Sequence, residues 1–246
     1  CCLGKLNAET KYLLDRFSYP EPQRLTDARV TLGEVVMDPP SCTSPDTTIF
    51  ETLQQMQQYN RTYCGVVDEN KKLIGFLTKS DISVIGLYDT ARSIEIMSRT
   101  PLENFRKTLD GRILYDDPEM KLNGKVSVIA MTEESKLKNY DVAGRIVVCG
   151  NDPQAQKAVI EMGAGMLIVV WAQEVTEQVL AAAKARHCPI LLSGHGGMNT
   201  LRYIYFSPSV SQIMKTELVS FRTQELAEDV GRKMLQSRYH VYPVTQ

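Results

Sequence analysis

Two hydrophobic patterns divide the chain, and the first is a strand that runs into a helix. Leu73 to Leu77 are apolar around one glycine, Gly75, which is typical of a buried strand that another part of the protein approaches closely. Thr78 follows as a residue type that caps helices. Asp81 stands three positions later, where the helix dipole favours negative charge. The pattern predicts a core strand followed directly by a capped helix.

The same residues admit a second interpretation. The Thr78 hydroxyl and the Asp81 carboxylate are three positions apart, so they point the same way from the first turn of a helix. Together they suit the diol of a ribose, with the helix N-terminus beside a phosphate group. Taken alone, a capped helix after a core strand is the simpler interpretation, and we favour it.

Further elements of the same kind precede this pattern. Ser41–Thr43 predicts a short strand, and Val66–Leu73 predicts two strands joined by a turn. Between them, Ile49, Leu53 and Met56 recur on one face of a helix. These elements together predict one small module of strands and helices.

A search for internal repeats finds part of this pattern again near the C-terminus. Residues 213–215, Ile-Met-Lys, repeat residues 36–38, Val-Met-Asp. Three apolar residues then repeat the helix face: Leu226, Val230 and Met234. The chain is therefore predicted to contain two copies of one module.

The second copy is incomplete. It stops at Gln246, inside or just after its first long strand, and no counterpart of Thr78 and Asp81 follows. The chain also begins at Cys1 rather than at a methionine. We expect that it was cut from something longer.

A different pattern begins at Gly124. Apolar strands are predicted at 126–130, 145–149, 166–170 and 189–192, with helical stretches at about 152–162 and 174–187. Apolar strands that alternate with helices indicate an α/β layer with a mostly parallel sheet. Trp171 directly follows the third strand, and we assign it to packing.

Composition limits the function classes. The 246 residues are 43% apolar and 23% charged, which is ordinary for a globular protein. A net charge of −1 without a long basic run argues against a nucleic-acid surface, and no window resembles a membrane span or a signal peptide. The six cysteines form no C-x-x-C, and only His187 lies near one, Cys188. We expect reduced cysteines, no metal in this chain and a cytoplasmic location.

The pattern from Gly75 to Asp81, with the helix and hairpin before it, resembles the second half of a CBS domain. CBS domains are small βαββα modules that pair and bind adenosine nucleotides in the clefts of the pair. Gly65 departs from the family's usual proline before the central valine, whereas Pro243 keeps it. The α/β module between the copies is similar to the DRTGG domain of certain family II inorganic pyrophosphatases, with residues 150–152, Gly-Asn-Asp, at that family's Gly-Asp-Arg type turn.

Two more stretches carry this resemblance. Leu3–Phe17 resembles the catalytic-domain segment before the insertion, and Ser237–Val244 resembles the Arg-Tyr segment at the nucleotide cleft and dimer seam. The chain is thus identified as a member of this group, as its regulatory insert. The implied fold class is α/β, with an α+β CBS pair plus an α/β DRTGG-like domain. The implied domains are an N-terminal segment and linker at 1–27, CBS copy 1 at 28–90, a linker at 91–122, the DRTGG-like domain at 123–206 and an incomplete CBS copy 2 at 207–246.

The resemblance implies a regulatory nucleotide: AMP, ADP or a diadenosine polyphosphate. The residues expected to contact it are Thr43, Tyr63, Gly65, Thr78, Lys79, Asp81, Val219, Ser220, Arg238, Tyr239, His240, Tyr242 and Pro243. Arg238 is the candidate for the phosphates. Tyr239 is the candidate for stacking on adenine or on its counterpart in a dimer. Ser193–Gly197 could cradle a phosphate, but we favour a flexible turn because no Gly-Lys-Ser/Thr follows.

Catalysis is assigned to the parent enzyme. The resemblance implies hydrolysis of pyrophosphate with manganese or cobalt, which needs clustered Asp and His ligands that this chain lacks. The expected partners are a second copy bound through the CBS domains, small-molecule nucleotides and catalytic domains of the same polypeptide, without nucleic acid or membrane. Two alternatives stay open: a ligand-free structural dimerisation module, and a stand-alone CBS–DRTGG energy sensor.

Overall fold

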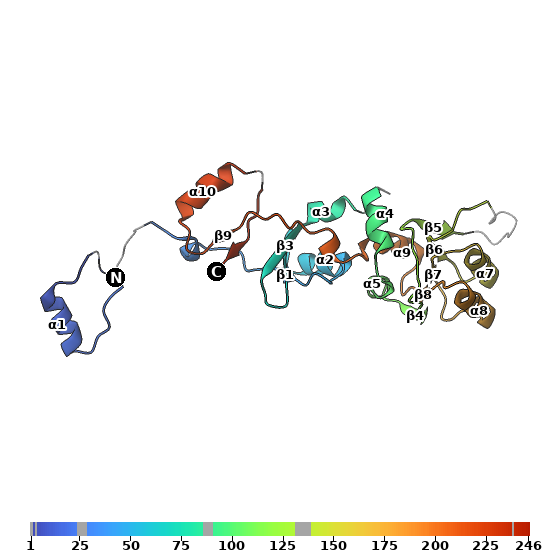
Figure 1. The fold of residues 1–246 in the computed structure, drawn as a ribbon, viewed down its shortest axis with the longest axis horizontal. Coiled ribbons are helices and arrows are strands. Elements are labelled where there is room, and N and C mark those ends of the chain that lie inside the picture. The colour runs from blue at the N-terminus through green and yellow to red at the C-terminus, as the bar shows by residue number, and fades with distance from the viewer. Residues whose placement is uncertain (1, 3, 24–28, 86–90, 131–138, 238) are drawn as a thin grey trace. The chain divides into compact units, whose positions relative to one another are not determined.

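The computed structural model describes residues 2, 4–23, 29–85, 91–130, 139–237 and 239–246. Contacts within the chain divide it into two compact units, and Figure 1 shows the elements of each. One unit, which we call the central unit, comprises residues 40–218. The other, the terminal unit, comprises residues 1–39 and 219–246.

A small three-stranded sheet opens the central unit. Its order is β1 (Cys42–Thr43), β2 (Tyr63–Val67) and β3 (Leu73–Thr78), with β2 parallel to β1 and antiparallel to β3. Helix α2 (Ile49–Gln58) lies between β1 and β2 in the chain, and Thr48 and Glu51 form a capping box at its start. Met56 of α2 shares a buried cluster with residues of the strands, so the predicted module of strands and helix is confirmed.

The segment before the second copy completes this sheet. A 3₁₀ turn, η3 (Val210–Gln212), leads to Lys215, which pairs antiparallel with Phe76 of β3. A Cβ atom at Gly75 would lie 2.3 Å from Met214 Sδ. The close approach that the glycine predicted is therefore made by the Met214 side chain.

A five-stranded sheet forms the rest of the central unit. Its order is β4 (Arg112–Tyr115), β8 (Ile190–Leu192), β7 (Met166–Val169), β6 (Ile146–Cys149) and β5 (Val126–Ile129). Strands β5 to β8 are parallel, and only β4 runs antiparallel. The predicted α/β layer with a mostly parallel sheet is confirmed.

Helices cover both faces of this sheet (Figure 1). Helices α7 (Pro153–Glu161) and α8 (Glu177–Ala185) share one buried cluster with the sheet. On the other face lie α4 (Ala91–Ser98), α5 (Leu102–Thr108) and the segment of α9 (Gly197–Tyr203) and η2 (Ile204–Phe206). Burial on both faces explains why the strands are continuous apolar runs rather than alternating ones.

Two expectations about this domain differ from the structure. The stretch 91–122, expected to be a linker with one helix near residues 102–109, contains that helix as α5, but it also supplies α4 and β4 and buries Phe105 completely. Its prolines and polar residues hide this role in the sequence, because β4 is a half-exposed edge strand without a strong apolar run. Trp171, expected to pack, is 74% exposed and has a φ of +59°, although its ring borders Gly196.

The terminal unit contains the second, shorter copy. Strand β9 (Phe221–Arg222) pairs parallel with β10 (Val244–Thr245), and α10 (Ala227–Leu235) lies between them in the chain. Phe221, Val230 and Leu32 form its small buried cluster. Helix α1 (Ala8–Arg16), capped by Asn7, buries none of its side chains.

The two copies exchange the segments at which they begin. Thr31, near the start of the first copy, pairs antiparallel with Leu226 of the second, and Ser209, near the start of the second copy, pairs antiparallel with Thr48 of the first. Thr31 and Ser209 therefore occupy equivalent positions in the two copies, and each directly precedes a 3₁₀ turn: η1 (Leu32–Glu34) in the first copy and η3 in the second.

This equivalence corrects the repeat alignment by one residue. Ile213 follows η3 directly, as Val35 follows η1, so residues 213–215 correspond to 35–37 rather than to 36–38. The error arose because the methionines at 37 and 214 were aligned by type, whereas the 3₁₀ turns fix the register.

Candidate functional site

Thr78 and Asp81 form a complete capping box at helix α3 (Lys79–Ser83). Asp81 Oδ2 accepts hydrogen bonds from the Thr78 backbone N–H at 2.9 Å and from the Thr78 hydroxyl at 2.6 Å. In return, Thr78 Oγ1 accepts the Asp81 N–H at 3.3 Å. The capped-helix interpretation is confirmed, and the polar groups of the candidate ribose site are fixed in place by it.

The second oxygen of Asp81 contacts a residue that the sequence did not connect with it. Lys215 Nζ lies 2.7 Å from Asp81 Oδ1, and the two side chains are 51% and 18% exposed. Burial raises the pKa of Asp81, but hydrogen bonds from Lys215 and Thr78 outweigh it and hold that pKa below its usual value. Asp81 is therefore a charged carboxylate at neutral pH.

The strands place other predicted residues beside this carboxylate. Tyr63 lies opposite Thr78, and Gly65 lies opposite Phe76; residues opposite each other share one face of a sheet. The rings of Tyr63 and Phe76 stack with centroids 6.0 Å apart. This face of the small sheet thus joins an aromatic surface to the Thr78–Asp81 pair.

Two more predicted residues lie near this surface in the sequence but differ in exposure. Lys79, the first residue of α3, is exposed as expected. Thr43 pairs with the fully buried Val66, so its side chain lies on the core face of the sheet. The structure therefore does not bring Thr43 together with Tyr63 and Thr78.

The remaining predicted residues belong to the terminal unit. Val219 and Ser220 are exposed directly before β9, and His240 is exposed before β10. The Pro243 carbonyl accepts the Phe221 N–H at 3.0 Å. Arg238, the candidate for the phosphates, lies outside the described residues.

Tyr239 and Tyr242 contact each other in this unit. Their rings meet edge to face at 6.3 Å, and the Tyr242 hydroxyl donates to the Tyr239 carbonyl at 2.8 Å. Tyr242 also packs on Phe221 and bonds the Ser237 hydroxyl. Tyr239 is 48% exposed, so its ring retains surface for stacking, whereas Tyr242 holds the turn together.

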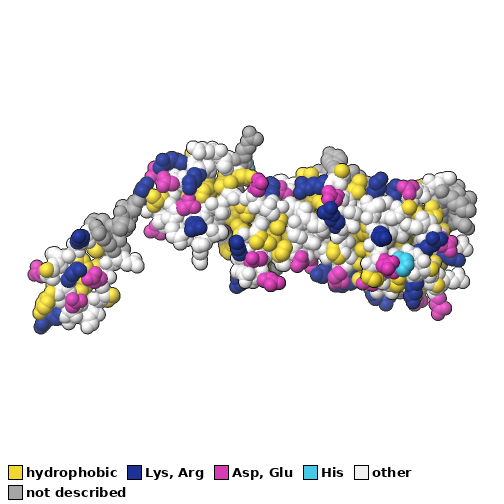
Figure 2. Space-filling view, in the orientation of Figure 1, with side chains coloured by type: hydrophobic (Ala, Val, Ile, Leu, Met, Phe, Trp, Pro, Cys, Tyr) yellow, Lys and Arg dark blue, Asp and Glu magenta, His cyan; other side chains and the backbone are white. Residues whose placement is uncertain are grey.

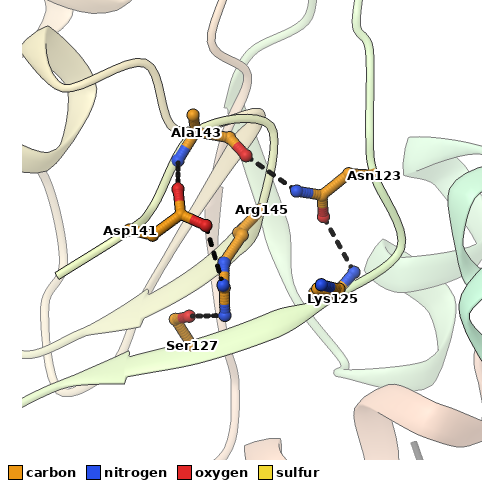
Figure 3. Close-up of polar contacts among 6 residues, drawn as sticks. All are labelled: Asn123, Lys125, Ser127, Asp141, Ala143 and Arg145. Atoms are coloured by element: carbon orange, nitrogen blue, oxygen red, sulfur yellow. Dashed lines mark hydrogen bonds and ion pairs between the residues drawn. The ribbon is translucent and has the colours of Figure 1, made fainter.

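A polar cluster at the amino ends of β5 and β6 could be mistaken for a site (Figure 3). Arg145 contacts Asp141 Oδ2 at 3.0 Å and Ser127 Oγ at 3.3 Å. Asn123 donates to the Ala143 carbonyl at 2.7 Å. Hydrogen bonds from Arg145 hold the pKa of Asp141 below its usual value. The contacts drawn order the segments before β5 and β6 and connect them with each other and with Ser127 of β5, so they account for the cluster as a structural one.

A second cluster connects β4 to the end of α8. Asp117 Oδ2 accepts the Tyr115 hydroxyl and lies 3.0 Å from His187 Nδ1, while Asp117 Oδ1 accepts the Glu119 N–H at 2.8 Å. The Tyr115 hydrogen bond lowers the pKa of Asp117 and raises the pKa of Tyr115 to about 12. These contacts tie the edge strand to the layer.

The glycine-rich turn after β8 is held by its own side chains. The Ser193 and Thr200 hydroxyls are 2.7 Å apart, and Ser193 Oγ also accepts the His195 N–H at 3.1 Å. The His195 ring packs edge-on against Tyr203 at 5.1 Å. The Ser193 hydroxyl is thus engaged by hydrogen bonds within the turn.

Three wider observations concern the residues that the structure describes. Among them, no group of three or more His, Cys, Asp or Glu side chains could hold a metal ion. No helix of the described ranges has the length and apolar character to cross a membrane. On the face drawn in Figure 2, acidic and basic side chains are interspersed rather than gathered by sign.

Comparison with known proteins identifies two domains. The family model of the CBS domain matches residues 32–85, and that of the DRTGG domain matches residues 104–205. The cobalt-dependent inorganic pyrophosphatase of Clostridium perfringens is 30% identical over 244 residues, which are 98% of this chain and 44% of that protein. A probable manganese-dependent inorganic pyrophosphatase of Thermotoga maritima is 24% identical over 238 residues, or 96% of this chain and 43% of that protein. The chain thus spans less than half the length of these relatives.

One solved structure resembles the chain closely. It contains the CBS and DRTGG domains of the regulatory region of Clostridium perfringens pyrophosphatase, complexed with the activator diadenosine tetraphosphate. The TM-score is 0.75 at 27% identity, and the match covers 88% of this chain and 94% of that one. The chain is therefore a CBS- and DRTGG-domain protein, homologous to the manganese- and cobalt-dependent inorganic pyrophosphatases and similar in structure to the regulatory region of one of them.

Proposed function

We propose that this chain is an adenine-nucleotide-binding regulatory region that controls an attached inorganic pyrophosphatase. The observation that carries the proposal is the similarity to a regulatory region that binds diadenosine tetraphosphate, across 94% of that region. The Thr78–Asp81 pair supports the proposal, because the charged Asp81 carboxylate can accept hydrogen bonds from ribose hydroxyls. The neighbouring Tyr63–Phe76 surface can stack on the base.

The direct test is calorimetric titration of the 246-residue chain with AMP, ADP and diadenosine tetraphosphate. We expect all three to bind. Asp81→Ala should weaken binding by roughly 1.5–3 kcal/mol for each charge-assisted hydrogen bond lost. Glu103→Gln is the matched control, because Glu103 is an exposed carboxylate paired with Arg106 in the other domain. Equal affinities of the wild type and Asp81→Ala would contradict the site assignment.

Diadenosine tetraphosphate should bind more tightly than AMP. Two nucleotide sites in a CBS dimer would bring phosphates face to face, so the linked ligand makes its second contact within one complex. Regulation further requires that AMP and the bridged ligand favour different dimer geometries. Tyr239, a residue that is 48% exposed, is the candidate for sensing that difference. Unchanged responses of the full-length enzyme after Tyr239→Ala would contradict this role.

Assembly is the next part of the proposal. We expect a two-fold homodimer whose contacts include α10 and Tyr239, since Met234, Leu235 and Tyr239 are 40%, 88% and 48% exposed. Light scattering at high protein concentration should give the mass of two chains. A monomer under those conditions would count against the dimer.

Catalysis belongs to domains outside this chain. With manganese or cobalt present, we expect no hydrolysis of pyrophosphate by the 246 residues alone. Turnover that stays proportional to chain concentration through a second purification would overturn the regulatory assignment.

One observation favours the alternative of a ligand-free dimerisation module. Both oxygens of Asp81 already have partners within the chain, so the site is satisfied without a nucleotide. The calorimetric titration separates the two functions. A dimer that binds none of the three ligands would support the structural module.

A further inference from the structure

The Asp81 carboxylate has one oxygen that a ligand can reach without breaking the helix cap. Oδ2 accepts two hydrogen bonds from Thr78, at 2.9 Å and 2.6 Å, and these fix the first turn of α3. Oδ1 is engaged by Lys215 Nζ at 2.7 Å. A hydroxyl group that donates to Asp81 must therefore approach Oδ1 and meet the Lys215 ammonium there.

Lys215 is held at this position by its backbone. Its N–H donates to the Phe76 carbonyl at 2.9 Å, and its carbonyl accepts the Phe76 N–H at 3.0 Å. The neighbouring Met214 packs on Gly75 so closely that a Cβ atom there would lie 2.3 Å from Met214 Sδ. Lys215 is thus distant from Asp81 in the sequence, yet its backbone is fixed beside β3.

The ammonium group keeps donors for a ligand. An ammonium has three N–H groups, and the ion pair with Asp81 uses one. The Lys215 side chain is 51% exposed, so the remaining donors can face solvent or a bound molecule. Asp81 and Lys215 together offer an acceptor and a donor to the same approaching group.

We infer that Lys215 is a specificity-determining residue of the proposed nucleotide site, and that with Asp81 it recognises the vicinal diol of a ribose. The ribose 3′-hydroxyl donates to Asp81 Oδ1 and the 2′-hydroxyl accepts from Lys215 Nζ. A vicinal diol fits because each hydroxyl both donates and accepts. The pair carries no net charge, which favours a neutral diol over a phosphate at this point. The inference rests on the proposed nucleotide binding.

The ligand pair AMP and 2′-deoxy-AMP tests this recognition, because the two differ only in one hydroxyl of the diol. The wild type should bind AMP about tenfold more tightly, the effect of one charge-assisted hydrogen bond. Lys215→Met keeps an unbranched side chain of nearly the same length and removes the donor. It should reduce the preference to about twofold or less, chiefly through weaker AMP binding.

Two variants complete the experiment. Lys215→Arg restores a cationic donor and should recover part of the preference. Lys72→Met removes an exposed lysine from the β2–β3 turn and should leave the tenfold preference intact. Thermal unfolding without ligand checks that each variant folds.

The outcomes separate the two levels of the proposal. A Lys215→Met protein that keeps the full preference, or that loses affinity for both ligands equally, overturns the role of Lys215. A wild type that binds both ligands equally also overturns it but leaves nucleotide binding in place. A wild type that binds neither ligand overturns the proposed function itself.

Discussion

The most informative single change is Asp81→Asn, which removes the charge but keeps the shape of the side chain. Asn still offers a carbonyl oxygen to the Thr78 N–H, so the cap is weakened rather than lost. The ion pair with Lys215 disappears, and the bonds from Thr78 become neutral ones. The variant therefore isolates the contribution of the charge to the stability of β3 and α3.

The magnitude follows from the contacts. A surface ion pair contributes about 0.2–1 kcal/mol, and the half-exposed Lys215 places this pair in that range. Replacing charge-assisted by neutral hydrogen bonds from Thr78 costs about 1 kcal/mol. We expect a local loss of about 1–2 kcal/mol. Asp81→Ala, which also removes the hydrogen bonds that the side chain of residue 81 accepts in the capping box, should lose roughly 1 kcal/mol more.

Amide hydrogen exchange is the suitable assay because it reads local opening. In peptides that cover residues 73–85, Asp81→Asn should exchange about 5–30 times faster than the wild type at pH 7. Glu103→Gln, with its exposed partner Arg106, should change exchange near its own helix by less than about 0.5 kcal/mol.

The pH dependence gives an independent check. The pKa of Asp81 is lowered in the folded protein, mainly because the hydrogen bonds from Lys215 and Thr78 outweigh the effect of burial. A lowered pKa gives stability that is present above the unfolded value of about 3.9 and is lost as the pH falls through the folded value. The difference between wild type and Asp81→Asn should thus be full at pH 7 and vanish in strong acid. Equal exchange at pH 7, or a difference that persists in strong acid, would refute this account.

Two other predictions concern stability and reactivity. Gly124→Ala should destabilise the protein far more than Gly144→Ala in thermal unfolding. Both glycines have a positive φ, which costs other residues about 1–2 kcal/mol. Of the two, Gly124 is the one where a Cβ atom would meet backbone, 1.9 Å from the Ile94 carbonyl oxygen. Similar losses of stability in the two variants would contradict this. With a thiol reagent at pH 8, the exposed Cys42 should be labelled and Cys188 should not, because burial raises the pKa of Cys188 to about 12; equal labelling rates by mass spectrometry would count against the buried thiol.

The sequence was sufficient for elements whose signal is local. The strands at 146–149 and 166–169 are apolar runs that are each followed by a helix, and burial on both faces of the sheet makes such runs recognisable in the sequence. The capping box of Thr78 and Asp81 was readable for the same reason, since both residues lie within one turn. Strand β4 was missed because it is a half-exposed edge strand whose only neighbour is β8, far along the chain.

The site was predicted less well than the fold because its geometry is not local. Lys215 entered the sequence analysis only as part of a repeat, and no spacing rule connects it with Asp81. Thr43 was named from the family pattern, and its partner Val66 places it on the core face instead. A signal for Lys215 did exist in the repeat: Met214, the large apolar residue before it, needs a surface to pack on, and Gly75 provides one.

The exchange of leading segments between the two copies has a consequence for synthesis of the chain. Thr31 finds its partner only when Leu226 has been made, and Thr48 waits for Ser209. Neither copy can therefore reach its final hydrogen bonding on the ribosome while the α/β domain between them is being translated. In that domain, strands β5 to β8 are neighbours in the order in which they are made, so most of its sheet is able to fold first. The nascent chain should then hold a largely folded α/β domain before either copy is complete: the first copy can close once Ser209 is available, and the second only when Leu226 has been made.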